Sequence, residues 1–196
     1  MAHQKRQTIS KKLPILRKGS KYVVRASSHH RDSVPVVIAI RDMLKLAKTA
    51  KEVKNLVNQK QLKINGRDVK DIKESIRLFS VLNADKPYIL TLSPHHKFSF
   101  QPSPSPDSRL AKVTNRSLIN KDTFQLHLHD GSNLLTSEKN IKVHDTITLD
   151  FSTKIKSHTP IEKAKSAFIF QGKYAGLEGQ IQSVENKMAK IKLDDK

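Results

Sequence analysis

The groups with which this sequence could do chemistry are lysine and arginine side chains at regular spacing. Arg41, Lys45 and Lys48 recur every three or four residues, so they would share one face of a helix. Lys51 and Lys54 would share a face of a following helix. Such rows suit a phosphate backbone, because each cation can donate charge-assisted hydrogen bonds to phosphate oxygens. Solvated helix faces also carry lysine, but between residues 33 and 83 eleven basic residues accompany only five acidic ones.

The composition points to a polyanionic partner. The chain has 37 Lys and Arg against 18 Asp and Glu, a formal charge of +19 over 196 residues, which attracts nucleic acid or an acidic membrane surface. The sequence has no apolar run of membrane length, no Trp and no apolar segment behind its charged N-terminus, so we expect no membrane association and no secretory signal. The absence of Cys excludes disulfides and thiolate zinc sites and agrees with a cytoplasmic setting.

The N-terminal segment is a block of one charge sign. Residues 1–31 contain nine Lys and Arg and no acidic residue. Such a block without apolar periodicity is expected to stay unfolded until it meets a counter-charge. We interpret it as an arm that phosphate contacts order, and a solvated tail is the alternative.

The cation rows require two helices to position them. In SVPVVIAIRDMLKLA the apolar residues recur at helical spacing from Val37 to Ala47, and Pro35 fits the first turn. The string TAKE predicts a second helix with a capping box, in which Thr49 is the N-cap and Glu52 stands three residues later.

A tight hairpin follows the helices, because Asn65-Gly66 in LKINGRDV is the dipeptide that a type I′ turn prefers. Within the proline-rich stretch 93–108, SPSPD is expected to be an irregular linker or exposed loop. Beyond it the apolar period becomes two, in QLHLHDGSNLL and VHDTITLDF, which predicts a small antiparallel β module. In AFIFQGKYAGLEGQIQSV two strands flank a loop that carries Gly172, Gly176 and Gly179. Glycines at this spacing permit positive φ and close approach of the backbone to a partner.

These motifs together resemble a known family. TAKEVKNLV followed by LKING resembles the RNA-binding module of bacterial ribosomal protein S4, which also occurs in pseudouridine synthases and the tyrosyl-tRNA synthetase tail. The order of the basic arm, LPILRKGSKYVV, SVPVVIAIRDMLKLAKTAKEV, QLHLHDGSNLL, VHDTITLDF and GKYAGLEGQI is similar to that of the archaeal and eukaryotic ribosomal S4e family, over nearly the whole chain. In that family the last segment is a KOW motif, which opens a small SH3-like barrel.

The resemblance implies a multi-module α+β protein. Its parts would be a basic N-terminal arm (1–32), a helix–helix–hairpin RNA-binding module (33–85), a central antiparallel β domain (86–160) and a short or incomplete KOW-like SH3-type segment (161–196). It further implies a structural role in the small ribosomal subunit in the cytoplasm. The expected partners are small-subunit rRNA and neighbouring ribosomal proteins, with no small-molecule substrate.

The resemblance also assigns RNA-binding roles to basic and aromatic residues in three of these segments. They are Lys11, Lys12, Arg17 and Lys18 in the arm, Arg41, Lys45, Lys48, Lys51, Lys54, Lys63 and Arg67 in the module, and Lys173 and Tyr174 in the KOW loop.

The sequence gives less support to a metal site or a catalytic site. His127 and His129 stand two apart on a predicted strand and could share a metal, but the sequence indicates no third ligand. Asp130 precedes Gly131, so a turn residue is favoured over a catalytic carboxylate. No phosphate-binding loop, nucleophile elbow or HExxH pair is present. We therefore expect no enzyme, no catalytic residue, no metal and no cofactor.

Three alternatives to a ribosomal protein stay open at this stage. One is a free RNA-binding assembly or quality-control factor that uses the same module. Another is an RNA-modifying enzyme related to pseudouridine synthases, which would need a large additional catalytic domain. A transcription elongation factor would carry its KOW motif after a different N-terminal domain.

Overall fold

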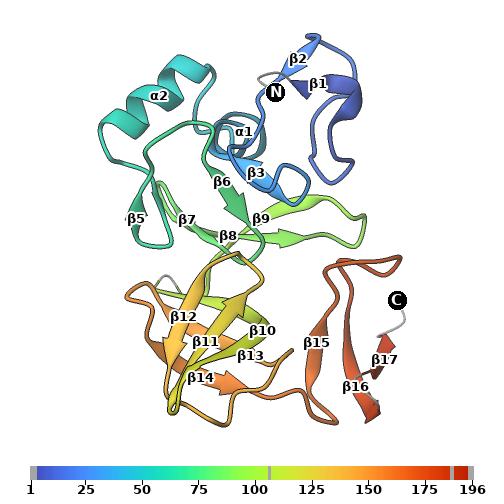
Figure 1. Cartoon of the computed structure of the whole chain (residues 1–196). Helices are drawn as coiled ribbons and strands as arrows, with labels where there is room; N and C mark the ends of the chain where they lie inside the picture. The colour runs from blue at the N-terminus through green and yellow to red at the C-terminus, as the bar shows by residue number, and fades with distance from the viewer. Residues whose placement is uncertain (1–3, 106, 186–187, 194–196) are drawn as a thin grey trace. The chain divides into compact units, whose positions relative to one another are not determined.

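The computed structural model describes residues 4–105, 107–185 and 188–193, and the chain divides into two compact units, residues 1–106 and 107–196. The first three residues of the expected arm and the last three of the KOW-like segment lie outside this description. Within the described residues the fold is mostly β, with several small sheets, rather than an even α+β mixture (Figure 1). The four-segment division stays a prediction.

The elements of the first unit are β1 (Gln4–Lys5), η1 (Arg6–Thr8), β2 (Tyr22–Val23), β3 (Ser33–Pro35), α1 (Val36–Ile38), η2 (Ala39–Met43), α2 (Ala50–Asn58), β4 (Lys63–Ile64), β5 (Arg67–Asp68), β6 (Ser75–Arg77), β7 (Val81–Asn83), β8 (Pro87–Leu92) and β9 (Phe98–Pro102). Those of the second unit are β10 (Ser108–Asn120), β11 (Thr123–Leu128), β12 (Asn133–Thr136), β13 (Thr146–Asp150), β14 (Ile155–Thr159), β15 (Ser166–Phe168), β16 (Glu178–Glu185) and β17 (Met188–Leu193).

The first predicted helix is shorter and more buried than its sequence suggests. It starts after Pro35 as α1 and continues as the π-helical turn η2, where Leu44 N donates to Ala39 O at 2.9 Å. Residues 36–40 are completely buried, so this helix has no solvent-facing stripe. It has ended before Lys45, whose φ of 58° is left-handed. The expectation that Arg41, Lys45 and Lys48 share one helix face is therefore wrong.

The second helix forms where the capping box predicts it. Thr49 is the N-cap of α2, and its hydroxyl accepts a hydrogen bond from Glu52 N at 3.3 Å. Val53 and Val57 form its buried face. A cap of this kind stabilises a helix by about 1 kcal/mol. None of the helices in the described part of the chain is long and apolar enough to span a membrane.

The hairpin is also confirmed, because Asn65 and Gly66 both have positive φ, 50° and 78°, between β4 and β5. Its strands open a five-stranded sheet of order β5-β4-β7-β8-β9. β9 ends at Pro102, and the described residues of SPSPD, 103–105 and 107, lie outside any helix or strand, as expected. Phe98 and Phe100 pair with Leu92 and Leu90, and this alternation outweighs the flanking prolines.

The described part of the arm, from residue 4 to 32, is folded onto the first unit, so the expectation of an unfolded arm is wrong for it. β1 pairs with β2. Leu13 and Ala26 are buried, at 7% and 4% exposure. Phe98 N at the start of β9 donates to Lys12 O at 2.8 Å. A few apolar anchors and backbone hydrogen bonds thus hold a segment whose charge pattern alone predicts disorder.

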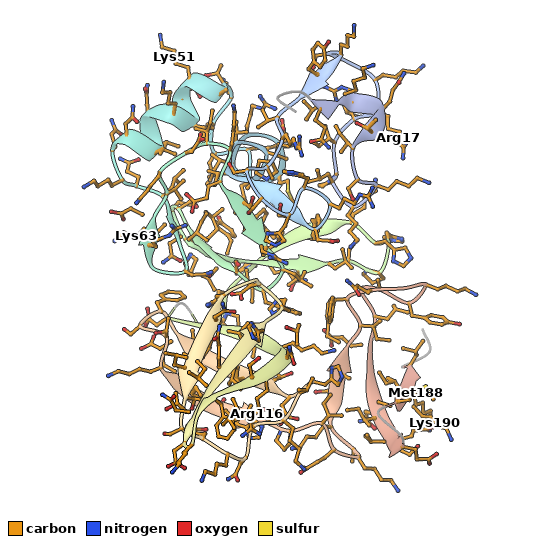
Figure 2. All side chains as sticks on the ribbon, in the orientation of Figure 1. Arg17, Lys51, Lys63, Arg116, Met188 and Lys190 are labelled. Carbon is orange, nitrogen blue, oxygen red and sulfur yellow. The ribbon has the colours of Figure 1, made fainter. Side chains whose placement is uncertain are left out.

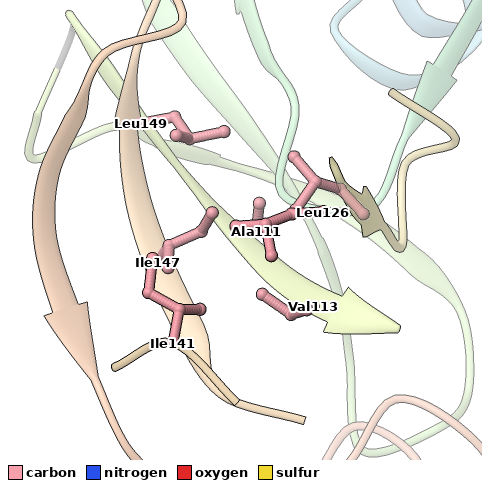
Figure 3. Packing of buried hydrophobic residues seen from close by; sticks show 7 residues of the cluster. Ala111, Val113, Leu126, Ile141, Ile147 and Leu149 are labelled. Carbon is pink, nitrogen blue, oxygen red and sulfur yellow. The ribbon is translucent and has the colours of Figure 1, made fainter. Parts of the chain in front are cut away.

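The second unit is built on one long strand. β10 pairs with β13 through residues 108–112 and with β11 from Val113 onward, in a five-stranded sheet of order β12-β11-β10-β13-β14. This division lets the sheet enclose its core, which Figure 3 shows. The fully or almost fully buried members of that core are Ala111, Val113, Leu126, Leu128, Ile141, Ile147 and Leu149. The predicted period-two alternation in these strands is confirmed.

The KOW-like segment forms a three-stranded sheet of order β15-β16-β17. Gly179 allows two of its strands to approach, because a Cβ there would clash with Lys192 O and lie 2.8 Å from Ile191 Cγ2. The close approach predicted for this glycine therefore involves the chain's own β17. The Phe170 ring, in the loop after β15, lies 5.3 Å from Lys112 Nζ on β10.

A buried ion pair fixes the turn between β11 and β12. Arg109 and Asp130 form a salt bridge with side chains only 11% and 7% exposed. Asp130 Oδ1 also accepts hydrogen bonds from Ser132 N at 2.9 Å and from its hydroxyl at 2.6 Å. Asp130 is thus a turn residue, as predicted, and burial lowers the pKa of Arg109.

Removing the charge of Asp130 is expected to destabilise the second unit strongly. Asp130→Asn would leave the Arg109 cation buried without a counter-charge, which costs about 3–5 kcal/mol in comparable sites. Chemical denaturation measures the loss of unfolding free energy. Asp122→Asn is the matched control, since its salt bridge with Lys139 is exposed and such pairs contribute about 0–1 kcal/mol. Equal losses in the two variants would contradict this role for the buried pair.

Candidate RNA-binding surfaces

Three lysines at the start of α2 form an open row of cations, here called the α2 lysine row. Lys48 precedes the N-cap, and Lys51 and Lys54 stand three residues apart in the helix. All three side chains are exposed, and none of them forms a salt bridge with the residues that the structure describes. Figure 2 shows Lys51 pointing away from α2 into solvent. Their ammonium groups are therefore free to meet an anion.

The acidic residue within this row is already engaged. Glu52 Oε2 accepts a hydrogen bond from Lys48 N at 2.8 Å, and Oε1 accepts one from the Thr49 hydroxyl at 3.0 Å. These hydrogen bonds lower the pKa of the Glu52 carboxyl, and the bond from Lys48 N has the larger effect. Its negative charge stabilises the N-terminus of α2, which would otherwise attract a phosphate. An anion at this surface would therefore meet the lysine side chains rather than the helix end.

The two predicted cations nearest α1 differ in their availability. Arg41 forms a bidentate pair with Asp42, at 2.9 and 2.8 Å, and is only partly exposed. Hydrogen bonding to Asp42 raises the pKa of Arg41, although burial acts in the opposite direction. Lys45 is exposed in the turn before α2 and has no carboxylate partner in the described ranges. Only Lys45 of this pair can meet a phosphate without giving up an existing ion pair.

The hairpin cations are both paired with carboxylates. Lys63 Nζ lies 3.9 Å from Asp68 Oδ1, its cross-strand neighbour in the β4–β5 hairpin. Arg67 forms a salt bridge with Glu74, whose second oxygen accepts a hydrogen bond from Lys70 N. Of the seven cations predicted in residues 33–85, the structure therefore engages Arg41, Lys63 and Arg67 and leaves four lysines free.

The arm presents its cations in a loop between β1 and β2. Arg17 and Lys18 are exposed there and have no carboxylate partner in the part of the chain that is described. Lys11 is also exposed, whereas Lys12 Nζ lies 2.5 Å from Asp32 Oδ1. In Figure 2 Arg17 stands at the opposite side of the first unit from Lys63.

The predicted KOW residues lie together in the loop between β15 and β16. Lys173 Nζ is 5.6 Å from the centre of the Tyr174 ring, and both side chains are exposed. Gly172 and Gly176 have φ of 90°, and Gly176 N donates to Ile169 O at 2.6 Å. The loop thus offers an ammonium group and an aromatic face together. Such a combination can contact both a phosphate and a base.

The histidines considered as metal ligands take part in the β fold. His127 Nδ1 lies 3.0 Å from Asn133 Oδ1, and its Nε2 lies 3.2 Å from the Ser117 hydroxyl. His129 Nδ1 accepts a hydrogen bond from Lys112 N at 3.2 Å. Among the residues described, no three His, Asp or Glu side chains are grouped so that they could hold a metal ion.

The charge pattern does not predict which basic residues stabilise the fold through hydrogen bonds to the chain itself. Arg116 Nη1 donates to the carbonyls of Lys139 and Ile141, at 3.2 and 3.1 Å, and its guanidinium lies 3.7 Å from the centre of the Phe124 ring. In the arm, the guanidinium of Arg6 likewise donates hydrogen bonds to backbone carbonyls. The Lys63–Asp68 pair did have a signal in the sequence, because a two-residue turn at Asn65-Gly66 places them opposite each other.

Comparison with known proteins finds similarity to ribosomal proteins. The family model described as ribosomal family S4e matches residues 84–155. Small ribosomal subunit protein eS4 of Archaeoglobus fulgidus is 32% identical over 187 residues, covering 92% of this chain and 79% of the relative. The eS4 protein of Pyrobaculum islandicum is 32% identical over 197 residues, covering 94% and 83%. The crystal structure of 30S ribosomal protein S4e from Thermoplasma acidophilum has the same fold, with a TM-score of 0.71, 22% identity and coverage of 83% of this chain and 88% of that one. The chain belongs to the eS4 family of small ribosomal subunit proteins.

Proposed function

We propose that this chain binds small-subunit rRNA through three cationic surfaces and acts as a structural constituent of the small ribosomal subunit in the cytoplasm. The surfaces are the α2 lysine row with Lys45, the arm loop around Arg17 and Lys18, and the KOW loop with Lys173 and Tyr174. The observation that carries the proposal is the open, unpaired state of the α2 lysine row on a chain of charge +19. Family membership supports the ribosomal assignment.

The chemistry of these surfaces suits RNA better than a small ligand. A row of separate ammonium groups neutralises successive phosphates and does not require a closed pocket. Lysine is a compact, mobile charge that follows a backbone without reading base edges. The paired cations Arg41, Lys63 and Arg67 would reach phosphate only by exchanging a carboxylate for it, so we assign them secondary contacts. Nothing in this arrangement calls for catalysis, which agrees with the non-enzymatic role of the family.

The four predicted segments fit this proposal as units of binding. The arm, the helix–helix–hairpin module and the KOW-like segment would each contribute one cationic surface. The central β domain would position the KOW loop, since Phe170 beside that loop contacts Lys112 of β10. Neighbouring ribosomal proteins would cover the remaining surfaces of the second unit.

Sedimentation separates the ribosomal role from that of a free assembly factor. Small subunits from cells that express the chain are expected to carry it in a one-to-one ratio, and to retain it in high salt. Quantitative mass spectrometry of sucrose-gradient fractions measures this ratio. A chain found only on immature particles, or absent from mature subunits, would identify an assembly or quality-control factor instead.

The affinity for rRNA is expected to depend steeply on salt. If about ten phosphates are neutralised, the logarithm of the association constant falls with the logarithm of salt concentration at a slope near −7 to −9. Filter binding to transcribed 16S rRNA of Archaeoglobus fulgidus, the source of one relative, gives this slope. A slope shallower than about −3 would mean that most of the basic residues do not contact RNA.

The α2 lysine row is expected to contribute more than its share of the charge. Changing Lys48, Lys51 and Lys54 together to Ala should weaken binding to the same rRNA about a hundredfold, at roughly 1 kcal/mol for each lost charged contact. The circular dichroism spectrum should stay unchanged, because all three side chains are exposed.

The matched control removes three lysines of the second unit that are equally exposed and lack a carboxylate partner in the described chain, Lys121, Lys142 and Lys154. We expect a loss of less than about tenfold for this triple variant, because such contacts would be nonspecific. Equal losses in both triple variants would show a nonspecific cation layer rather than an assigned site.

A further inference from the structure

The loop that carries Arg17 and Lys18 is built around another arginine of the arm. Arg6 follows β1, and its guanidinium donates three hydrogen bonds into the far side of the loop. Nη1 donates to Leu16 O at 2.5 Å, Nε to Ser20 O at 2.7 Å and Nη2 to the Ser20 hydroxyl at 2.9 Å. Arg6 N also donates to Lys21 O at 3.0 Å. Its side chain is thus directed to the chain itself, although its charge suggests a phosphate contact.

Glycine at position 19 completes this arrangement. Gly19 has a φ of 135°, and a Cβ there would lie 3.3 Å from Arg6 Cζ and Nη2. The guanidinium therefore packs against the backbone where a side chain would crowd it. The Ser20 hydroxyl in turn donates to Tyr22 O at 3.1 Å, which links the loop to β2.

The result is a fixed loop with three outward side chains at its tip. Leu16 is 82% exposed, and Arg17 and Lys18 are exposed beside it. The first acidic residue of the chain is Asp32, and it pairs with Lys12. Two cations without a counter-charge therefore stand in one place before any RNA is present. Holding them there lowers the entropy that binding must remove.

We propose that Arg6 is a positioning residue that pre-organises the loop of residues 16–20 for RNA, so that Arg17 and Lys18 reach phosphates while Leu16 packs against ribose or base. This inference rests on the proposed rRNA-binding function. We assign Arg6 no phosphate contact, because three of its five guanidinium N–H groups donate to the loop. The fork geometry is essential, since a lysine at this position would keep the charge but could not span Leu16 O, Ser20 O and the Ser20 hydroxyl.

The test compares full-length variants for binding to transcribed 16S rRNA of Archaeoglobus fulgidus. The double change Arg17→Ala and Lys18→Ala should weaken binding about tenfold to a hundredfold, because it removes two charged contacts. Arg6→Lys should weaken binding about tenfold although it conserves charge, because the loop loses its order. Lys5→Ala is the matched control: it removes an exposed neighbouring charge whose side chain makes no hydrogen bond or salt bridge with the described residues, and should cost about threefold or less.

Two further measurements distinguish positioning from a general loss of structure. Added to the Arg17→Ala, Lys18→Ala background, Arg6→Lys should change the affinity by less than about twofold, because it acts through those residues. In the free protein, trypsin should cleave after Arg17 and Lys18 faster in Arg6→Lys than in the wild type. Gly19→Ala should also weaken RNA binding and speed the cleavage by trypsin, because it disturbs the loop backbone while Arg6 stays intact.

The possible failures are distinguishable. If the wild type itself does not bind the rRNA, the proposed function is wrong. If the wild type binds and Arg6→Lys or Gly19→Ala binds equally well, the pre-organised loop is wrong. An Arg6→Lys loss that persists in full on the Arg17→Ala, Lys18→Ala background would also overturn it, because Arg6 would then act independently of the loop cations.

Discussion

Mutual repulsion among 37 basic side chains, opposed by only 18 carboxylates, is the constraint on which this structure depends. The carboxylates are placed where they hold the fold together. Asp32 pairs with Lys12 of the arm, and Glu74 pairs with Arg67 of the hairpin. Many of the remaining cations are exposed, so the free protein carries an unbalanced charge that opposes compaction. An RNA phosphate backbone would supply the missing counter-charge, and its binding would stabilise the folded chain by mass action.

Arginine and lysine divide this work according to their geometry. The planar guanidinium can satisfy several acceptors at once, and Arg6 and Arg116 do so with backbone oxygens, while Arg109 forms the buried pair with Asp130. The α2 lysine row, by contrast, consists of long side chains that are exposed to solvent. Arginines therefore fix loops and turns, and in the arm Arg6 fixes the loop from which Arg17 and Lys18 project. The small cores of the two units would leave these turns weakly held without such hydrogen bonds.

Short sequence motifs predict the structure correctly where the backbone forms its hydrogen bonds within a few residues. Thr49 with Glu52 predicts the start of α2, and Asn65 with Gly66 predicts the turn of the hairpin, because each motif acts within four residues. The prediction of one solvent-facing stripe on the first helix is wrong for the opposite reason. Residues 36–40 are completely buried, so the apolar period there reports the core and not one helix face. The charge pattern did not predict the fold of the arm, because that fold depends on contacts up to 86 residues away, as between Phe98 N and Lys12 O.

The candidate surface follows the same division between local and long-range contacts. The positions of the basic residues are evident in the sequence, and so is the Lys63–Asp68 pair once the hairpin register is known. The Arg67–Glu74 and Lys12–Asp32 pairs span 7 and 20 residues and form only when the chain folds. Whether a cation is available to RNA is thus a property of the tertiary structure. A count of Lys and Arg therefore overstates the phosphates that this chain can neutralise, since each carboxylate pair must be broken before its cation can meet one.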